Sequence, residues 1–471
     1  MSTRNQLKTL TALLSCWAMS ATAQGLNLPD GHVEWQCGNR WDDCRLVRKD
    51  ANGLPVTTAN PAAVGTLRSR LTLSHDGKTI YAPVNRNLTA LNAETLQPRW
   101  RQPLFPNASQ NDVLPTVMAE SPDGSTLAVS RTGYGEAARQ DWGNIILLKA
   151  GTGEVIRTLQ HPVSTLKDEW QKFYNTVTAL AFTPDGSALA VGSTGGGIRV
   201  IQLDGERETR LQGACGWPRP VAHAGPVRDL RWTTNSTLIS TANDGTVRLW
   251  KNGQPSACLT VKQGGFQLHG LPNGQLLVQN ATTFTLVNLA TFKKVRELGP
   301  TVSAVQDVRV SPSKVTLADE TSEQDYALPS GEFLAVRGPN LAQLRQGNTN
   351  IEVRPNLQVN VTQGGKMHTL NAKVIPPENV RGWKKRWSIS LTGQSLRVDA
   401  TNYVRVMTME GDDFQNRYVW NVNTGKLLSC ETWQMGLMYG GEPQKTATDA
   451  ACKAALQHGQ GRQDIKTVWH E

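Results

Sequence analysis

The chain has 471 residues, of which 38 % are hydrophobic and 19 % charged, and its formal net charge is +10. This apolar content can fill a large core and is too high for a disordered chain. The sequence contains no internal run of about 18 apolar residues, which excludes a protein with several membrane-spanning helices.

The first 23 residues have the pattern of a signal peptide. Arg4 and Lys8 precede the mostly apolar stretch 10–18, and residues 21–23 (Ala-Thr-Ala) offer the small-x-small pattern that a signal peptidase accepts. We therefore expect Gln24 to be the mature N-terminus and the protein to be periplasmic or secreted. Cleavage lowers the formal charge to +8, and the scattered basic residues then serve solubility rather than an anionic partner.

An alternative cleavage site lies at residues 13–16 (Leu-Leu-Ser-Cys). This pattern resembles the lipobox of bacterial lipoproteins, and cleavage there would leave Cys16 acylated and the protein lipid-anchored. Mass spectrometry of the mature N-terminus separates the two alternatives, because an unmodified Gln24 start excludes the lipid anchor.

Residues 24–66 are predicted to form an N-terminal extension. Within it, segment 32–48 is expected to lend a strand to the following sheet or to cover its edge, with Cys37 and Cys44 close together in sequence.

Six cysteines remain after removal of Cys16, and six thiols allow 15 connectivities. An exported chain favours disulfides, whereas no Cys-x-x-Cys and no histidine at ligand spacing support a metal site. Sequence proximity favours three pairs: Cys37–Cys44, Cys215–Cys258 and Cys430–Cys452.

Residues 67–430 repeat one sequence motif, in which an apolar strand, a tight turn and a second strand follow one another. The copies are spaced by about 45 residues, a period typical of propellers with four-stranded blades. One small antiparallel sheet cannot bury both faces alone, whereas radial stacking buries them and protects the edges. The turns begin at His75, Pro122, Pro184, Thr234, Pro272, Ser311, Pro355 and Thr392.

Eight copies predict an all-β β-propeller of eight four-stranded antiparallel blades. The copy at 350–370 is short and weakly patterned, so seven blades with one irregular excursion is the alternative.

One copy carries more detail than the others. It runs from His223-Ala-Gly-Pro-Val through Ser240 to Asp244-Gly-Thr-Val-Arg-Leu-Trp250, and it resembles the WD40 repeat family. That resemblance implies a buried hydrogen-bonded set within the blade, made here by His223, Ser240, Asp244 and Trp250. Two positions depart from the family pattern: Ala222 replaces a glycine, and Lys251 replaces an aspartate. Degenerate bacterial propellers with YVTN-like repeats have the same general appearance.

Residues 431–471 are predicted to be a C-terminal extension. A short helix is expected from Thr446 to Gln457, with Thr448 or Asp449 as its N-cap. A disulfide between Cys452 and Cys430 would join this helix to the last strand.

Catalytic motifs are absent from the sequence: it contains no HExxH, GxGxxG, Walker-type loop or nucleophile elbow. The glycines at 195–197 fit a turn, and the acidic pairs 42–43 and 412–413 lack the spacing of a calcium loop. His223 is expected to be buried, and a general base must reach its substrate. The 14 tryptophans fit blade packing, so neither a metal nor a quinone cofactor is predicted.

One basic and aromatic segment is a candidate binding site. Charge and stacking there could hold an anionic glycan, a lipid headgroup or a nucleic acid. The alternative is a loop entering the last blade, with Trp387 in the core and the cations solvated. The segment's binding candidates are Arg381, Trp383, Lys384, Lys385 and Arg386.

Two first strands share the pattern apolar-x-Asp-apolar-Arg-apolar. Because first strands line the channel of a propeller, their charges could polarise it, although pairing within one blade or solvation explains them equally well. The residues are Asp229, Arg231, Asp307 and Arg309.

The sequence therefore predicts an exported WD40-like protein that acts as a protein-binding or scaffolding module, without cofactor or transmembrane span, and that is itself a monomer. One alternative is a propeller hydrolase or lyase, or a quinoprotein-like enzyme, with a site at the channel mouth. The other alternative is a binder of the cell envelope or of an anionic polymer.

Overall fold

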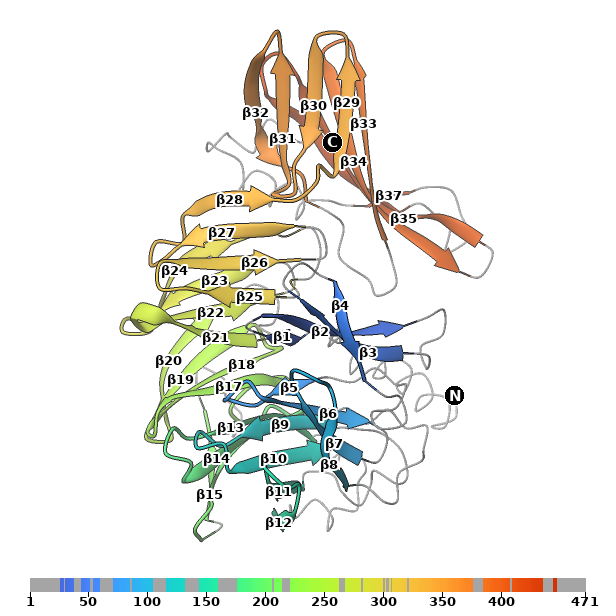
Figure 1. Cartoon of the computed structure of the whole chain (residues 1–471). Coiled ribbons are helices and arrows are strands. Elements are labelled where there is room, and N and C mark those ends of the chain that lie inside the picture. Colours follow the sequence, from blue (N-terminus) through green and yellow to red (C-terminus); the bar gives the residue numbers. More distant parts are fainter. Residues whose placement is uncertain are drawn as a thin grey trace, which may run out of the picture. The chain divides into compact units, whose positions relative to one another are not determined.

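The computed structural model describes most of the chain between residues 26 and 446 (Figure 1). The described ranges are 26–28, 30–37, 44–50, 54–59, 71–84, 87–104, 116–131, 144–159, 176–205, 207–213, 221–261, 267–280, 283–299, 301, 305, 307–319, 322–375, 384–406, 409–434 and 444–446. The chain divides into two compact units, one of residues 1–281 with 285–295 and the other of residues 282–284 with 296–471.

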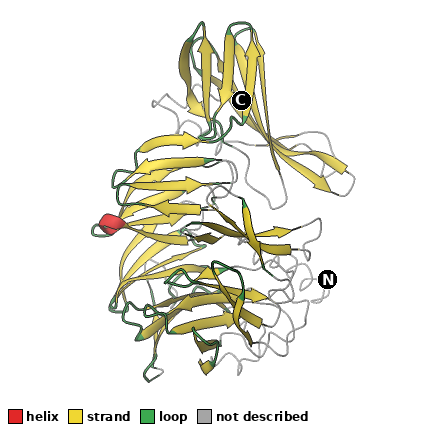
Figure 2. Ribbon diagram, in the orientation of Figure 1, coloured by secondary structure: helices red, strands yellow, loops and turns green. Residues whose placement is uncertain are grey.

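The first unit holds five complete sheets and most of a sixth, and each sheet is an antiparallel meander of four strands in chain order. The strands are β1 (Leu26–Leu28), β2 (Gly31–Cys37), β3 (Cys44–Asp50), β4 (Pro55–Thr58); β5 (Thr72–Leu73), β6 (Thr79–Val84), β7 (Asn87–Asn92), β8 (Pro98–Pro103); β9 (Thr116–Glu120), β10 (Thr126–Arg131), β11 (Ile145–Lys149), β12 (Val155–Leu159); β13 (Val177–Phe182), β14 (Ala188–Ser193), β15 (Ile198–Gln202), β16 (Glu208–Leu211); β17 (Val227–Thr234), β18 (Thr237–Ala242), β19 (Thr246–Lys251), β20 (Gln254–Thr260); and β21 (Gln267–Leu271), β22 (Gln275–Gln279), β23 (Phe284–Asn288), β24 (Lys293–Leu298). A short 3₁₀ turn, η3 (Pro272–Gly274), joins β21 to β22 and is the helical element of Figure 2.

The second unit holds three further sheets, the last of which has five strands. The strands are β25 (Asp307–Val310), β26 (Lys314–Ala318), β27 (Glu323–Ala327), β28 (Phe333–Arg337); β29 (Ala342–Gln346), β30 (Thr349–Val353), β31 (Gln358–Gln363), β32 (Lys366–Lys373); and β33 (Lys384–Thr392), β34 (Ser395–Val406), β35 (Met409–Asn421), β36 (Leu427–Gln434), β37 (Gln444–Thr446).

Three tight turns of the repeat are built by a hydroxyl residue two positions before an aspartate. Thr183 donates to the Asp185 carboxylate over 2.7 Å and accepts the backbone N–H of Ala188 over 2.9 Å. Gly186 follows with a φ of 74°, a conformation that glycine adopts without steric cost. The same hydroxyl-to-carboxylate bond recurs between Ser74 and Asp76 and between Ser121 and Asp123.

The hydrophobic cores of the first unit lie between successive sheets. Five buried clusters join β1–β4 to β5–β8, then β5–β8 to β9–β12, and so on to β21–β24. The first strands β9, β13, β17 and β21 contact one another in succession. Each of these sheets therefore buries its apolar side chains against its neighbours, as the repeat requires.

In the second unit, β29–β32 and β33–β36 share a core of their own. Its buried members run from Ile351 to Cys430, and it includes the stacked rings of Tyr418 and Trp420. The first strands β29 and β33 contact each other, as do β32 and β36, so the two sheets pack face to face in the same order.

The predicted all-β chain of four-stranded antiparallel sheets is confirmed, while the number of blades stays a prediction. Seven of the eight turn phrases precede the second strand of a sheet, but the phrase at Pro355 lies between β30 and β31, the second and third strands. Here the prediction was wrong, because the turn around Gly347, whose φ is 57°, supplies the first hairpin without an Asp-Gly pair.

The flanking segments differ from expectation in part. Residues 26–58 form a complete four-stranded sheet rather than a single added strand, with Val33, Trp35 and Leu46 in its core. Thr446 ends the extra strand β37. The signal-peptide and lipobox residues 1–23, and residues 447–457 of the expected helix, lie outside the described residues. No helix among the described residues is long and apolar enough to cross a membrane.

The cysteines are described in part. Cys258 is part of a disulfide, and so is Cys430. Cys215 and Cys452, their predicted partners, lie outside the described residues. The strand register places Cys37 directly opposite Cys44, and a disulfide spans the Cα separation of such a pair. The predicted connectivity is compatible with these positions and stays a prediction.

Candidate functional site

The predicted polar set gathers around the sheet β17–β20. His223 lies just before β17, Ser240 on β18, Asp244 in the β18–β19 turn and Trp250 on β19. The turn is closed by Gly245, whose φ is 73°, and this glycine lets the chain reverse directly after the aspartate.

Hydrogen bonds join the four side chains in one direction. The Asp244 carboxylate lies 3.0 Å from Nδ1 of His223, and Nε2 of His223 lies 2.7 Å from the Ser240 hydroxyl. The Trp250 indole N–H donates to the same hydroxyl over 2.9 Å. With Nδ1 protonated, His223 donates to Asp244 and accepts from Ser240, which leaves the serine oxygen to accept from Trp250.

Further donors surround the Asp244 carboxylate. It accepts the backbone N–H of Ala224, the hydroxyl of Thr246 and the Arg248 guanidinium at 3.0, 2.7 and 3.0 Å. Burial alone would raise the pKa of Asp244, but the bonds from His223, Ala224 and Thr246 outweigh it and hold the pKa well below its ordinary value. Arg248 also donates to the carbonyl of Ala222, which ties β19 to the segment before β17.

Serine, histidine and aspartate also form the catalytic triad of serine hydrolases, so the hydrogen bonds alone do not distinguish a catalytic from a structural role. Burial decides between the two roles: His223 and Ser240 both have 0 % exposure. A nucleophile must contact its substrate, and the Ser240 oxygen already accepts from Trp250. The arrangement therefore suits a structural network within the sheet.

Stability should depend on pH through His223. Burial lowers the pKa of His223, more than the neighbouring Asp244 raises it. The folded chain thus binds this proton less readily than the unfolded chain, so the histidine's contribution is complete above an unfolded pKa of about 6.5 and is lost as the pH falls below it. Urea unfolding at pH 7.5 and 5.5 should show a smaller loss of stability in His223→Gln than in the native chain. An equal loss in both would contradict this assignment.

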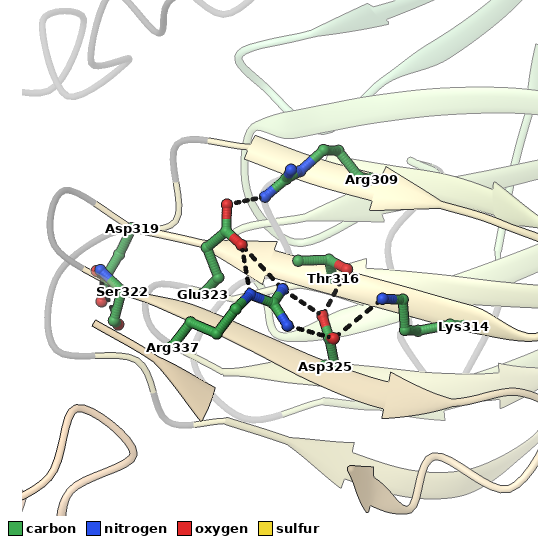
Figure 3. Close-up of polar contacts among 8 residues, drawn as sticks. All are labelled: Arg309, Lys314, Thr316, Asp319, Ser322, Glu323, Asp325 and Arg337. Atoms are coloured by element: carbon green, nitrogen blue, oxygen red, sulfur yellow. Dashed lines mark hydrogen bonds and ion pairs between the residues drawn. The ribbon is translucent and has the colours of Figure 1, made fainter. Parts of the chain in front are cut away.

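A second polar cluster covers one face of the sheet β25–β28 (Figure 3). Arg337 on β28 donates to both Glu323 and Asp325 on β27, with nitrogen–oxygen distances of 2.7–3.0 Å. Thr316 and Lys314 on β26 also donate to Asp325, over 2.7 and 3.0 Å. The strand register explains the meeting, because Thr316 pairs with Asp325 and Arg337 with Glu323.

The carboxylates of this charged face are saturated with donors. The Arg337 guanidinium is the largest of the causes that hold the pKa of Asp325 well below its usual range. Burial raises the pKa of Glu323, but bonds from Arg337 and Arg309 outweigh it and lower the pKa overall. Neither carboxylate is therefore suited to accept a proton near neutral pH, whereas the side chains of Arg309, Lys314 and Arg337 remain partly exposed to solvent.

The charged face was not predicted from the sequence because its members are spread over four strands: Arg309, Lys314, Thr316, Glu323, Asp325 and Arg337. Asp319 likewise has hydrogen-bond donors close by: its carboxylate accepts from the backbone N–H and the hydroxyl of Ser322 in the β26–β27 turn. The available signal was the alternation Glu323-Gln-Asp325-Tyr, which places the two acidic residues on one face of the strand and Gln324 and Tyr326 on the other.

The basic and aromatic segment is described in part. Arg381 and Trp383 lie outside the described residues, and Lys384 and Lys385 begin β33 with side chains that are not described. Arg386 is exposed, and Trp387 packs against the core shared by β29–β36. This position of Trp387 agrees with the alternative interpretation, in which the segment enters a blade and its tryptophan packs on the core.

The four predicted channel charges belong to two sheets, β17–β20 and β25–β28. Asp229 accepts the backbone N–H of Leu268 on β21 over 2.8 Å, and a Cβ on Gly270 of β21 would collide with the Arg231 guanidinium. These contacts join neighbouring first strands. Arg309 pairs with Glu323 of its own sheet, whereas Asp307 lies on β25 with a side chain that is not described.

The remaining candidates give no metal site among the described residues, which contain no group of three or more His, Cys, Asp or Glu side chains placed to hold an ion. Gly196 lies in a turn, with a φ of 81°, and its carbonyl accepts the backbone N–H of His223. Residues 42–43 lie outside the description, and the side chains of 412–413 are not described.

Comparison with known families identifies two repeats. Residues 155–202 and 218–251 match the family model "WD domain, G-beta repeat" (WD40). The second segment contains His223, Ser240, Asp244 and Trp250. The predicted resemblance to the WD40 repeat is confirmed for these two segments.

Curated relatives share a stretch of 65–91 residues with this chain. "Ribosome biogenesis protein YTM1" of Debaryomyces hansenii is 28 % identical over 91 residues, which is 18 % of this chain and 18 % of the relative. The proteins of the same name from Meyerozyma guilliermondii and Saccharomyces cerevisiae are each 34 % identical, over 65 and 80 residues, or 14 and 17 % of this chain and 12 and 15 % of the relatives. The matches therefore span less than a fifth of the length of these relatives.

Solved structures that this chain matches include a computationally designed protein, Ika8, and the C-terminal WD40 domain of Sif2. They are 15 and 16 % identical, each covers 72 % of this chain, and the match covers 95 and 91 % of the respective structures. Both TM-scores are 0.46.

Proposed function

We propose that this protein is a binding scaffold whose stacked sheets present surfaces to other proteins. The observation that carries the proposal is the contrast between its buried and exposed groups. The His223–Asp244 pair is enclosed in the sheet β17–β20, while large apolar side chains are exposed on the last strands of several sheets, such as Ile156 on β12 and Leu334 on β28. Exposed apolar side chains on outer strands favour contact with proteins.

Export from the cytoplasm is part of the same proposal. The N-terminal residues have the pattern of a signal peptide, and the disulfide-bonded Cys258 and Cys430 suit an oxidising compartment. The likeness to ribosome biogenesis proteins covers only 91 residues, or 18 % of this chain, so it supports the repeat fold and carries no ribosomal role to this chain.

Size fractionation of a native extract tests the scaffold proposal. The mature chain should elute in an assembly well above 51.5 kDa, the mass of the full 471-residue chain. Lysine cross-links to the partner should fall near exposed last strands, for example at Lys293 of β24 or Lys366 of β32. Elution of the whole population at the mass of the free chain would contradict the proposal.

A further inference from the structure

The sheet β29–β32 (Figure 1) differs from the sheets of the first unit because only one of its faces is apolar. In β14, β18 and β22 nearly every residue is buried, so both faces of these strands are packed. In β30 and β31, by contrast, buried residues alternate with partly exposed ones. The buried residues belong to the core shared with β33–β36, and successive residues of a strand point to opposite faces. The other face of the sheet is therefore polar and accessible to solvent.

Strand register arranges the side chains of this polar face in two rows that cross all four strands. The first row contains Arg345, Asn350, Thr362 and Met367. The second row contains Gln343, Glu352, Asn360 and Thr369. None of the eight residues is buried. Because neighbouring strands lie about 4.8 Å apart, each row is about 14 Å long, and the rows lie about 7 Å apart along the strands. This area suits a chain-like ligand better than a single small molecule.

Hydrogen bonds fix the orientation of the amide side chains in the rows. The Gln343 amide donates to Oδ1 of Asn350 over 2.9 Å, and the Thr369 hydroxyl donates to Oδ1 of Asn360 over 2.8 Å. The amide nitrogen of Asn360 lies 3.9 Å from Sδ of Met367. An amide has two hydrogens and two lone pairs, so the two asparagines can still donate to and accept from a ligand.

The two rows carry no net charge, although the whole chain has a formal charge of +10. Glu352 is the one carboxylate in residues 338–375. It lies within the rows, accepts from Asn350 over 3.1 Å and lies 3.7 Å from Arg354. The basic side chains of the sheet and its turns are Arg345, Arg354, Lys366, His368 and Lys373. Since Arg345 alone of these belongs to the rows and balances Glu352, an uncharged ligand matches them. A polyanion would meet the Glu352 carboxylate in the middle of the face.

The composition of the rows also disfavours a protein as the ligand. Protein interfaces are anchored by aromatic and other large side chains in buried pockets, and the rows contain one apolar side chain, Met367, which is 66 % exposed. Sugar hydroxyls both donate and accept hydrogen bonds, as the amides and hydroxyls of the rows do. The flexible thioether of Met367 can contact the C–H groups of a sugar ring.

We propose that the polar face of β29–β32 binds an uncharged polysaccharide, which lies along the two rows. The amides of Asn350 and Asn360 bind its hydroxyls, and Met367 packs against a sugar ring. This activity is separate from the proposed protein-binding function, so either can fail while the other stands.

Affinity electrophoresis of the full mature chain tests the proposal, with native gels that contain uncharged glucans, mannans, galactans or xylans. At least one of these polymers should retard the chain, and added salt should leave the retardation unchanged because the contacts are uncharged. The double variant Asn350→Ala/Asn360→Ala should bind about tenfold more weakly or less, since it removes amide hydrogen bonds to the sugar. The control Asn423→Ala removes an exposed amide from the β35–β36 turn and should bind as the native chain does.

Neither asparagine of the double variant is buried, so this variant should unfold at the same urea concentration as the native chain. Three results would overturn the proposal: no retardation by any of these polymers, equal retardation of the double variant and the native chain, or binding to anionic polymers alone that salt abolishes. Loss of a protein partner in the double variant, without any polysaccharide binding, would show that the face is a protein interface instead.

Discussion

Asp244→Ala is expected to lower the free energy of unfolding by about 3–5 kcal/mol, the usual cost of removing one partner from a buried ionic pair. The substitution leaves Nδ1 of His223, the backbone N–H of Ala224 and the Arg248 guanidinium without their shared acceptor. Urea unfolding followed by circular dichroism measures the loss.

The matched control is Asp204→Ala, which removes an exposed carboxylate from the β15–β16 turn. Exposed substitutions of this kind change stability by about 0.5 kcal/mol or less. Equal stability of the Asp244 and Asp204 variants would show that the polar set does not hold the sheet together.

Trp420→Ala is expected to cost about 3–5 kcal/mol through lost packing. Trp420 has 0 % exposure and stacks on Tyr418 with ring centres 5.7 Å apart. Its indole N–H makes no hydrogen bond with the described residues, so the loss reports packing alone. The core around Trp420 belongs to β29–β36, so the substitution should loosen these strands first. In the Trp420→Ala variant, trypsin should therefore cut within residues 342–434 before it cuts within residues 177–260, which belong to other sheets.

Trp433→Ala provides the comparison for the same protease experiment. Its ring is partly exposed, and its indole N–H donates to Glu431 two residues away. This variant should resist trypsin nearly as well as the native chain. Faster cleavage spread evenly over both sets of sheets in Trp420→Ala would contradict a separate core for β29–β36.

The repeat was predictable because its turns are encoded locally. In three copies, an Asp-Gly pair with a hydroxyl residue two positions earlier fixes the hairpin without any distant contact, as at Thr183 and Asp185. The His223 set was also accessible, since its members follow one another within 28 residues of one copy. The sheet at 26–58 was missed although Asp30-Gly31 stands where β1 turns into β2; the residue two positions before Asp30 is Leu28 instead of a hydroxyl residue.

The charged face and the polar rows of β29–β32 depend on strand register. Arg337 is 14 residues from Glu323 in sequence, and only the pairing of β27 with β28 brings them together. Likewise, the two polar rows form only through the pairing of four strands, which no single strand encodes by itself.

Hydrogen exchange at single-residue resolution tests most directly whether each sheet is buried between its neighbours. The middle strands β14, β18 and β22 are almost entirely buried, whereas the last strands β16, β20 and β24 are mostly exposed. The account predicts the slowest exchange in the middle strands and much faster exchange in the last strands, repeated from sheet to sheet. Equal protection of middle and last strands, or protection confined to one sheet, would contradict it.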